Sequence, residues 1–186
     1  MYLNNVSEIT TTSLRGQQLL WFVQIPQNNI QVIAETAFET VADLELLVLI
    51  NNAIGQIAPR TFHNNSWLFY LDYEGNNLTR LEPDILIGNQ FLAIVYFERN
   101  QINAIAPTFV RTLPTLLDYI NFSGNVCVDR FFLFGTDDLM TLANNGLGLC
   151  YRRFNGTDGI ERSINFRFSG TLVLNDEFGN EIGRFD

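Results

Sequence analysis

One run of seven residues is apolar throughout: Phe91-Leu92-Ala93-Ile94-Val95-Tyr96-Phe97. A run of this kind is typical of a central strand that is covered on both faces. Other runs rich in β-branched and aromatic residues lie on both sides of it, and we expect strands to dominate the chain. These runs are Gln18–Ile25, Ile30–Ala34, Trp67–Tyr73, Leu78–Leu81, Ile85–Ile87, Val126–Phe134, Leu147–Phe154, Ile160–Phe168, Thr171–Leu174 and Glu181–Phe185.

Turn signals between successive runs predict hairpins. Pro26-Gln27-Asn28-Asn29 separates the first two runs, and Asn155-Gly156-Thr157-Asp158-Gly159 separates Leu147–Phe154 from Ile160–Phe168. Asp176-Glu177-Phe178-Gly179-Asn180 separates the last two. Gly and Asn in such short connections favour the tight turns that join antiparallel strands.

Three segments carry helix signals. Thr40 can cap a helix from Val41 to Ala53, although the apolar stretch 46–50 also fits a buried strand. Pro114 can begin a second helix that ends before Ser123-Gly124, and Thr136 with Asp137 and Asp138 can begin a third, shorter one. We therefore predict a single globular domain over 1–186 with an α+β fold, made of a predominantly antiparallel β-sheet and about three short helices.

Two stretches resemble each other, Ile54–Phe62 and Ile102–Phe109. The similarity is short and does not continue into the flanking residues. Asn doublets also recur, but at irregular spacing, and we interpret them as turns. Repeat architectures need a more extended match at a fixed period, so the sequence does not predict one.

The composition points to a protein partner. The chain of 186 residues has a net charge of -9, 17% charged and 13% aromatic residues, and its 11 basic residues are all Arg. Charged residues usually make up about 25% of a domain, and Arg is favoured over Lys at interfaces. We expect part of the surface to be covered by a partner or by a second copy. A Phe-rich core under an Asn-rich surface is the alternative.

Charge and hydropathy exclude other partners. The sequence contains no basic run, so we do not expect nucleic acid binding. It has no apolar segment long enough to span a membrane and no basic, apolar leader after Met1. We predict a soluble protein, without membrane contact, in the cytoplasm or in an assembled particle.

Candidate chemical residues are few. His63 is the single histidine, and a zinc site normally takes four Cys or His ligands. Cys127 and Cys150 lie on predicted strands in the same half of the chain and could pair, but without a leader we expect them to stay reduced. We predict no metal site and no cofactor.

Charged pairs end or interrupt two of the strands. They are Glu98-Arg99 and Asp129-Arg130, which fit ordinary salt bridges or, alternatively, a cleft with acid and base groups. Familiar catalytic motifs are absent from the sequence. We therefore assign no catalytic residue.

The leading functional hypothesis is a non-enzymatic assembly or interaction protein, such as a structural subunit of a viral, phage or other multi-subunit particle. A second is an acidic immunity or inhibitor protein that neutralises a basic toxin or nuclease through its negative charge. A third is a lysine-free effector or toxin enzyme that acts in a eukaryotic cytosol, where the lack of Lys would avoid ubiquitin conjugation.

Overall fold

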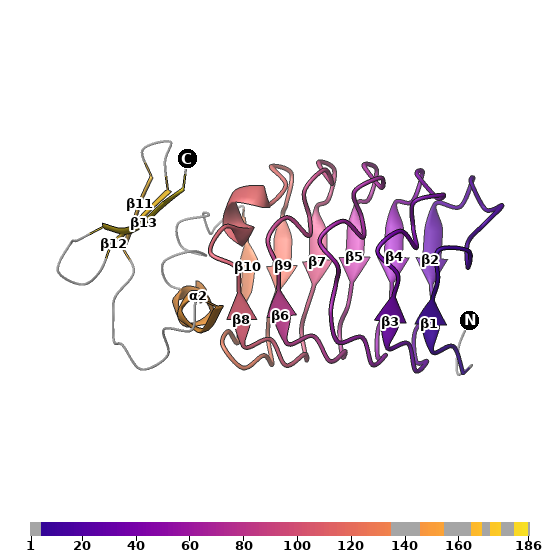
Figure 1. The fold of residues 1–186 in the computed structure, drawn as a ribbon, viewed down its shortest axis with the longest axis horizontal. Helices are drawn as coiled ribbons and strands as arrows, with labels where there is room; N and C mark the ends of the chain where they lie inside the picture. The colour runs from indigo at the N-terminus through magenta and orange to yellow at the C-terminus, as the bar shows by residue number, and fades with distance from the viewer. Residues whose placement is uncertain (1–4, 135–145, 155–164, 169–171, 176–180, 186) are drawn as a thin grey trace.

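The computed structural model describes residues 5–134, 146–154, 165–168, 172–175 and 181–185. Within residues 5–134 the chain winds into stacked turns, and successive turns place their strands side by side (Figure 1). The strands are β1 (Glu8–Ile9), β2 (Phe22–Gln24), β3 (Val32–Ile33), β4 (Leu46–Val48), β5 (Tyr70–Asp72), β6 (Arg80–Leu81), β7 (Ile94–Tyr96), β8 (Ala104–Ile105), β9 (Tyr119–Asn121), β10 (Phe131–Leu133), β11 (Asn165–Phe168), β12 (Leu172–Asn175) and β13 (Glu181–Phe185). The helices are the 3-10 helix η1 (Phe109–Thr112) and α2 (Gly148–Phe154).

The largest sheet in the described part of the chain has six strands in the order β10-β9-β7-β5-β4-β2. All neighbours from β2 to β9 are parallel, and β10 closes one edge antiparallel to β9. Two smaller parallel pairs, β1-β3 and β6-β8, form elsewhere on the same turns, and β11-β12-β13 form an antiparallel sheet.

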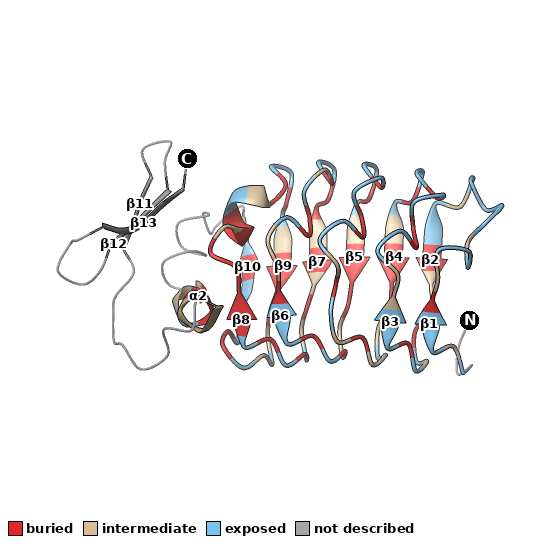
Figure 2. Cartoon of the chain, in the orientation of Figure 1, coloured by how far each residue is buried: buried red, intermediate tan, exposed pale blue. Residues whose placement is uncertain are grey.

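The turns repeat with a period of 24 residues. Val23, Leu47, Leu71 and Val95 face one another in register on neighbouring strands, and Ile120 continues the row one residue later than the period. All are buried, as are the apolar residues at the other inward positions of each turn (Figure 2). One turn alone could not cover its apolar side chains, so the stacking of turns creates the core.

An asparagine ladder satisfies the backbone where each turn leaves the large sheet. Asn76 donates from Nδ2 to the carbonyls of Leu49 and Tyr73, at 2.9 and 3.0 Å, and its Oδ1 accepts from the Ile54 amide at 3.1 Å. A side-chain amide can do this because it carries donors and an acceptor together. The residues of this ladder are Asn28, Asn52, Asn76, Asn100 and Asn125.

The predicted α+β fold with a predominantly antiparallel sheet is wrong. The apolar runs are strands, but each pairs with the equivalent run of the next turn and not across the adjacent loop. The hairpin expected around Pro26–Asn29 does not form, since β2 pairs with β4 and β3 with β1. Ile54 and Ile102 lie two periods apart, so the short similarity between their stretches was a sign of the repeat. Ile85–Ile87 lies in a turn.

The helix predictions also need correction. The segment 41–53 contains β4, and the segment after Pro114 leads into β9. The third predicted helix, at Thr136, lies outside the described residues. Helix α2 occupies the segment that we expected to be the strand Leu147–Phe154, so the hairpin predicted there is wrong as well. The pairing of β12 with β13 confirms the predicted closing hairpin.

A disulfide joins Cys127, in the last turn before β10, to Cys150 in α2. Both residues are buried, and their Cα atoms lie 5.1 Å apart, within the usual range for a disulfide. The expectation of two reduced thiols is therefore wrong. Among the residues described, no helix combines the length and the apolar character that crossing a bilayer requires.

Candidate functional site

The strongest candidate for a binding surface is the outward side of the six-stranded sheet, which we call the outer sheet face. Alternate residues of a strand point to opposite sides, so the neighbours of each buried residue point outward. Across the sheet these outward residues form rows in register. The first row is Phe22, Leu46, Tyr70, Ile94, Tyr119 and Leu133, and the second is Gln24, Val48, Asp72, Tyr96, Asn121 and Phe131.

Aromatic side chains are concentrated on the outer sheet face and beside it. The rings of Tyr70 and Tyr96 lie 5.6 Å apart, those of Tyr96 and Tyr119 5.3 Å, and those of Tyr119 and Phe131 5.9 Å. Trp21 and Phe69 are exposed by 55% and 47% just before β2 and β5. Exposed aromatic residues on a rigid surface are typical of protein interfaces.

Three carboxylates lie among these tyrosines. Asp72 is buried, and its oxygens accept hydrogen bonds from the Tyr70 hydroxyl and the Glu74 amide, each at 3.0 Å. Burial raises the pKa of Asp72. The same cause, together with the charge of Asp72, raises the pKa of Tyr70.

Glu98 completes this acidic group. Burial and the neighbouring Glu74 carboxylate raise the pKa of Glu98, and the Asn121 amide donates a hydrogen bond to Glu98. Arg99 forms its ion pair with Glu74 of the preceding turn. Among the described residues, no group of His, Cys, Asp or Glu side chains is arranged to hold a metal ion.

The second predicted charged pair is placed differently. Asp129 is exposed and accepts a hydrogen bond from the Gly124 amide at 2.6 Å. The Arg130 guanidinium lies 5.3 Å from the centre of the Phe132 ring. Both interactions are local to the last turns of the stack, and the pair lies directly before β10. Asp137 and Asp138 lie outside the described residues.

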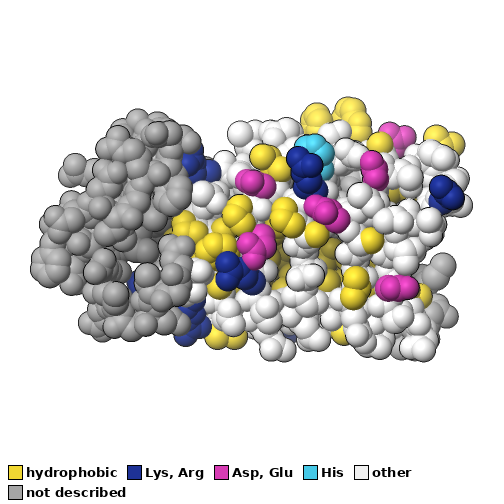
Figure 3. Space-filling view, viewed as in Figure 1, with side chains coloured by type: hydrophobic (Ala, Val, Ile, Leu, Met, Phe, Trp, Pro, Cys, Tyr) yellow, Lys and Arg dark blue, Asp and Glu magenta, His cyan; other side chains and the backbone are white. Residues whose placement is uncertain are grey.

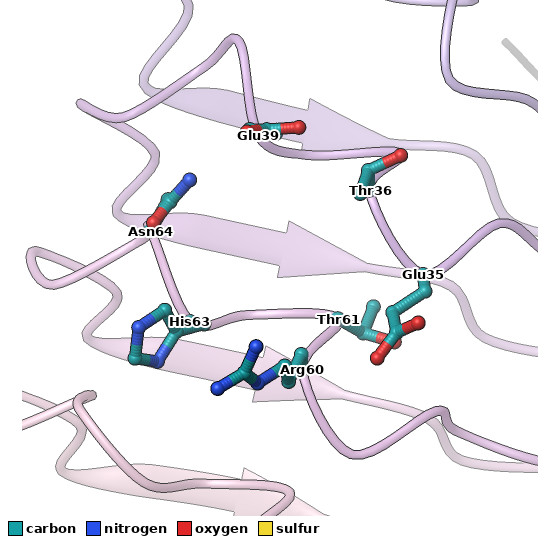
Figure 4. Close-up of a pocket in the computed structure, with 7 residues that line it drawn as sticks. All are labelled: Glu35, Thr36, Glu39, Arg60, Thr61, His63 and Asn64. Atoms are coloured by element: carbon teal, nitrogen blue, oxygen red, sulfur yellow. The ribbon is translucent and has the colours of Figure 1, made fainter.

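His63 lines an open hollow of about 340 Å³ with residues of two neighbouring turns (Figure 4). Arg60 lies beside His63 in this view, and Glu39 points away from it. In Figure 3 the histidine, in cyan, lies on the surface next to a basic side chain. The Thr61 hydroxyl, which also lines the hollow, donates to the Ala58 carbonyl at 2.9 Å. The Thr61 hydroxyl is therefore paired with the backbone and does not donate to His63.

A second hollow, of about 530 Å³, opens where the chain enters the large sheet. Leu19, Trp21, Asp43, Glu45 and Trp67 line it. Sequence reasoning missed this hollow and the outer sheet face as a whole, because both are defined by residues one or more periods apart. The signal that could have found them is the 24-residue recurrence of Asn52, Asn76 and Asn100.

The comparisons agree with this fold. Residues 23–78 match the family model described as leucine rich repeat. No curated protein sequence gives a significant match.

Three solved structures are among those with similar folds. A chain in the structure of the Toll–Spatzle complex of Drosophila is 19% identical, with a TM-score of 0.58 over 66% of this chain and 18% of that one. The ectodomain of the receptor kinase SOBIR1 from Arabidopsis thaliana is 22% identical, with a TM-score of 0.52 over 67% and 66%. The leucine-rich repeat domain of APL1B is 21% identical, with a TM-score of 0.50 over 68% and 42%. This chain thus spans 18% to 66% of the length of these proteins.

These findings overturn the functional hypotheses drawn from composition. A leucine-rich repeat fold does not fit a structural subunit of a virion or other particle, an acidic immunity protein or a toxin enzyme. The lack of Lys remains a fact of composition, but the functions inferred from it are wrong. The repeat match supports the coarser expectation of a protein partner.

Proposed function

We propose that this chain is a protein-interaction domain that binds its partner on the outer sheet face. The observation that carries the proposal is the run of ring contacts from Tyr70 through Tyr96 and Tyr119 to Phe131, which alternates between the two outward rows and crosses four neighbouring strands on one surface. The similarity to a chain of the Toll–Spatzle complex, whose name describes a protein complex, supports it.

The backbone of the stack favours binding on this side. Parallel strands in register hold the outward side chains at fixed positions, so a partner meets a surface that needs little ordering. Tyr and Trp carry large rings with few rotatable bonds and are frequent among the residues that dominate binding energy. The inward residues are buried and have no access to a partner.

The disulfide indicates the kind of compartment in which this function takes place. Cys127–Cys150 favours an oxidising compartment, because cytosolic proteins usually keep their thiols reduced. We therefore propose such a compartment in place of the cytoplasm. Alkylation of the protein as isolated from its source, followed by mass measurement, tests this proposal, and two alkylated thiols would contradict it.

Site-specific photo-crosslinking tests the proposed binding face. A benzophenone amino acid replaces Phe69, which is exposed directly before β5 and beside the outer sheet face. In a matched protein it replaces Gln56, which is exposed at the repeat position of Arg80 in the smaller β6-β8 sheet. We expect a discrete protein adduct in the native source from position 69 and none from position 56. Adducts of equal yield from the two positions, or from position 56 alone, would rule out the outer sheet face.

A further inference from the structure

We propose that the hollow between Trp21 and Trp67 receives an arginine side chain of the protein partner, with its guanidinium group over Asp43 and Glu45. This inference rests on the proposed function, since the hollow lies at one end of the outer sheet face. It adds the chemistry of the partner, which neither the repeat fold nor its structural neighbours specify.

Backbone pairing shows how the hollow is built. The amides of Glu45 and Leu46 donate to the Trp21 carbonyl at 2.8 and 3.1 Å, and the Phe69 amide donates to the Glu45 carbonyl at 2.8 Å. Glu45 therefore lies between Trp21 and Phe69 of the two adjacent turns. Two residues earlier, Asp43 has the repeat position that Trp67 has in the next turn. The turn that contains β4 thus contributes two carboxylates between two turns that contribute aromatic rings.

The walls of the hollow are exposed and are fixed by ring contacts. Trp21 and Trp67 are each 55% exposed. Trp67 stacks on Phe91 with ring centres 4.9 Å apart and planes inclined by 10°, and the ring centres of Trp21 and Phe22 are 5.9 Å apart. Among the described residues that line the hollow, none is Lys, Arg or His, so the hollow provides two acidic groups and no base.

A guanidinium group fits these walls better than other groups. It is flat, stacks on indole rings and donates paired hydrogen bonds to carboxylates. An ammonium group is a compact charge that has neither a flat face to stack on a ring nor a fixed pair of donors that matches a carboxylate. An apolar side chain would cover the carboxylates without a partner, which is unfavourable. The net charge of -9 also attracts a basic partner segment.

The chain contains two Trp residues, and both line the hollow, so its intrinsic tryptophan emission reports directly on occupancy. The probe is the blocked peptide acetyl-Leu-Arg-Leu-amide, titrated into the full chain. We expect a saturable change in emission. The matched peptide with citrulline in place of arginine keeps the shape of the side chain and removes its charge, and we expect it to bind at least about tenfold more weakly.

Two double variants with the same net charge distinguish the effect of the carboxylates in the hollow from the effect of the overall negative charge. Asp43→Asn with Glu45→Gln removes two charges from the hollow, and we expect it to weaken the arginine peptide about tenfold. Glu35→Gln with Glu39→Gln removes two charges from the hollow that contains His63, and we expect a change of less than about twofold. Circular dichroism confirms that each variant is folded.

Several outcomes would overturn the inference. They are an emission unchanged by the arginine peptide, equal binding of the citrulline peptide or of a matched peptide with lysine in place of arginine, and an equal loss of affinity in the two double variants. If position 69 still crosslinks to a partner while the arginine peptide fails, only the inference about the hollow fails. If the crosslink also fails, the proposed function fails with it.

Discussion

The two sides of the six-stranded sheet have the same backbone and opposite kinds of side chains. On the inner side, Leu47, Leu71 and Val95 repeat almost unchanged from turn to turn. On the outer side the adjacent row reads Leu46, Tyr70 and Ile94, and the row after it contains Asp72 and Tyr96. Packing between turns restricts the inner side chains to similar shapes, whereas the outer positions hold apolar, aromatic and acidic side chains in turn. We therefore expect the varied outer residues to determine binding specificity.

We expect the largest loss of stability on the inner side from a change in the asparagine ladder. Asn100→Ala leaves the Leu78 amide and the carbonyls of Tyr73 and Phe97 without their side-chain partner inside the stack. Since each unsatisfied buried group costs about 1–3 kcal/mol, we expect the free energy of unfolding to fall by about 3 kcal/mol or more in urea titrations. The matched control is Asn103→Ala, an exposed asparagine in the same turn, for which we expect a change within about 0.5 kcal/mol. Equal losses from the two variants would mean that the ladder has no special role.

The disulfide makes the next largest contribution to the free energy of unfolding, and it lies at the end of the inner core. Cys127→Ser with Cys150→Ser opens a link across 23 residues and should lower the free energy of unfolding by about 2–4 kcal/mol. Thermal unfolding with and without a reductant measures the effect. The wild-type protein should lose stability on reduction and the double variant should not change. A reductant that leaves the wild-type melting temperature unaltered would contradict the prediction.

A pair of tyrosines sharpens the contrast between the two sides. The Tyr73 hydroxyl is buried on the inner side and has no hydrogen-bond partner among the described residues, so Tyr73→Phe should stabilise the protein by about 1 kcal/mol. Tyr70→Phe on the outer side removes the hydrogen bond to Asp72 and should destabilise it by about 0.5–1.5 kcal/mol. Changes of the same sign in chemical unfolding would show that the two hydroxyls do not differ in this way.

Strands could be predicted from this sequence, but their partners could not. Apolar runs identify β2, β5, β7 and β10 because short runs of such residues are stiff and extended. The pairing of the strands depends on the 24-residue period, and the Asn doublets obscure that period. The ladder uses the first residue of one doublet, Asn76, and the second residue of another, Asn52. The helix predicted from Val41 fails because Leu44 and Leu47 imitate a helical spacing where the chain turns into a three-residue strand.

The site was predictable only where its residues are adjacent in the sequence. Glu98-Arg99 was recognised as a charged pair at a strand end, but Arg99 forms its ion pair with Glu74, one turn earlier. Trp21, Asp43 and Trp67 likewise meet only because the turns stack. Cys127 and Cys150 are close in space because α2 packs on the end of the stack, and the predicted strand at 147–154 could not indicate that.

The smallest predicted effect concerns Glu98 on the outer side and depends on pH. Burial and the Glu74 charge raise its pKa in the folded protein above 4.5, the value expected when unfolded. The folded protein therefore holds this proton more tightly. The stability contributed by Glu98 is fully present below about pH 4.5 and is lost as the pH rises through the folded pKa.

Replacing the carboxylate should remove this loss. Glu98→Gln keeps an oxygen for the Asn121 amide, and we expect it to stabilise the protein at pH 7 by up to about 0.5 kcal/mol and to flatten the pH dependence between pH 4.5 and 7. Urea unfolding at several pH values measures both effects. Glu39→Gln, which removes an equal charge outside the sheet, controls for the change in net charge. If the two variants are stabilised equally, the cause is the net charge of the whole chain. If only Glu98→Gln is stabilised, the Glu98 carboxylate lowers the stability of the free protein. A surface that binds a basic partner is expected to carry such carboxylates.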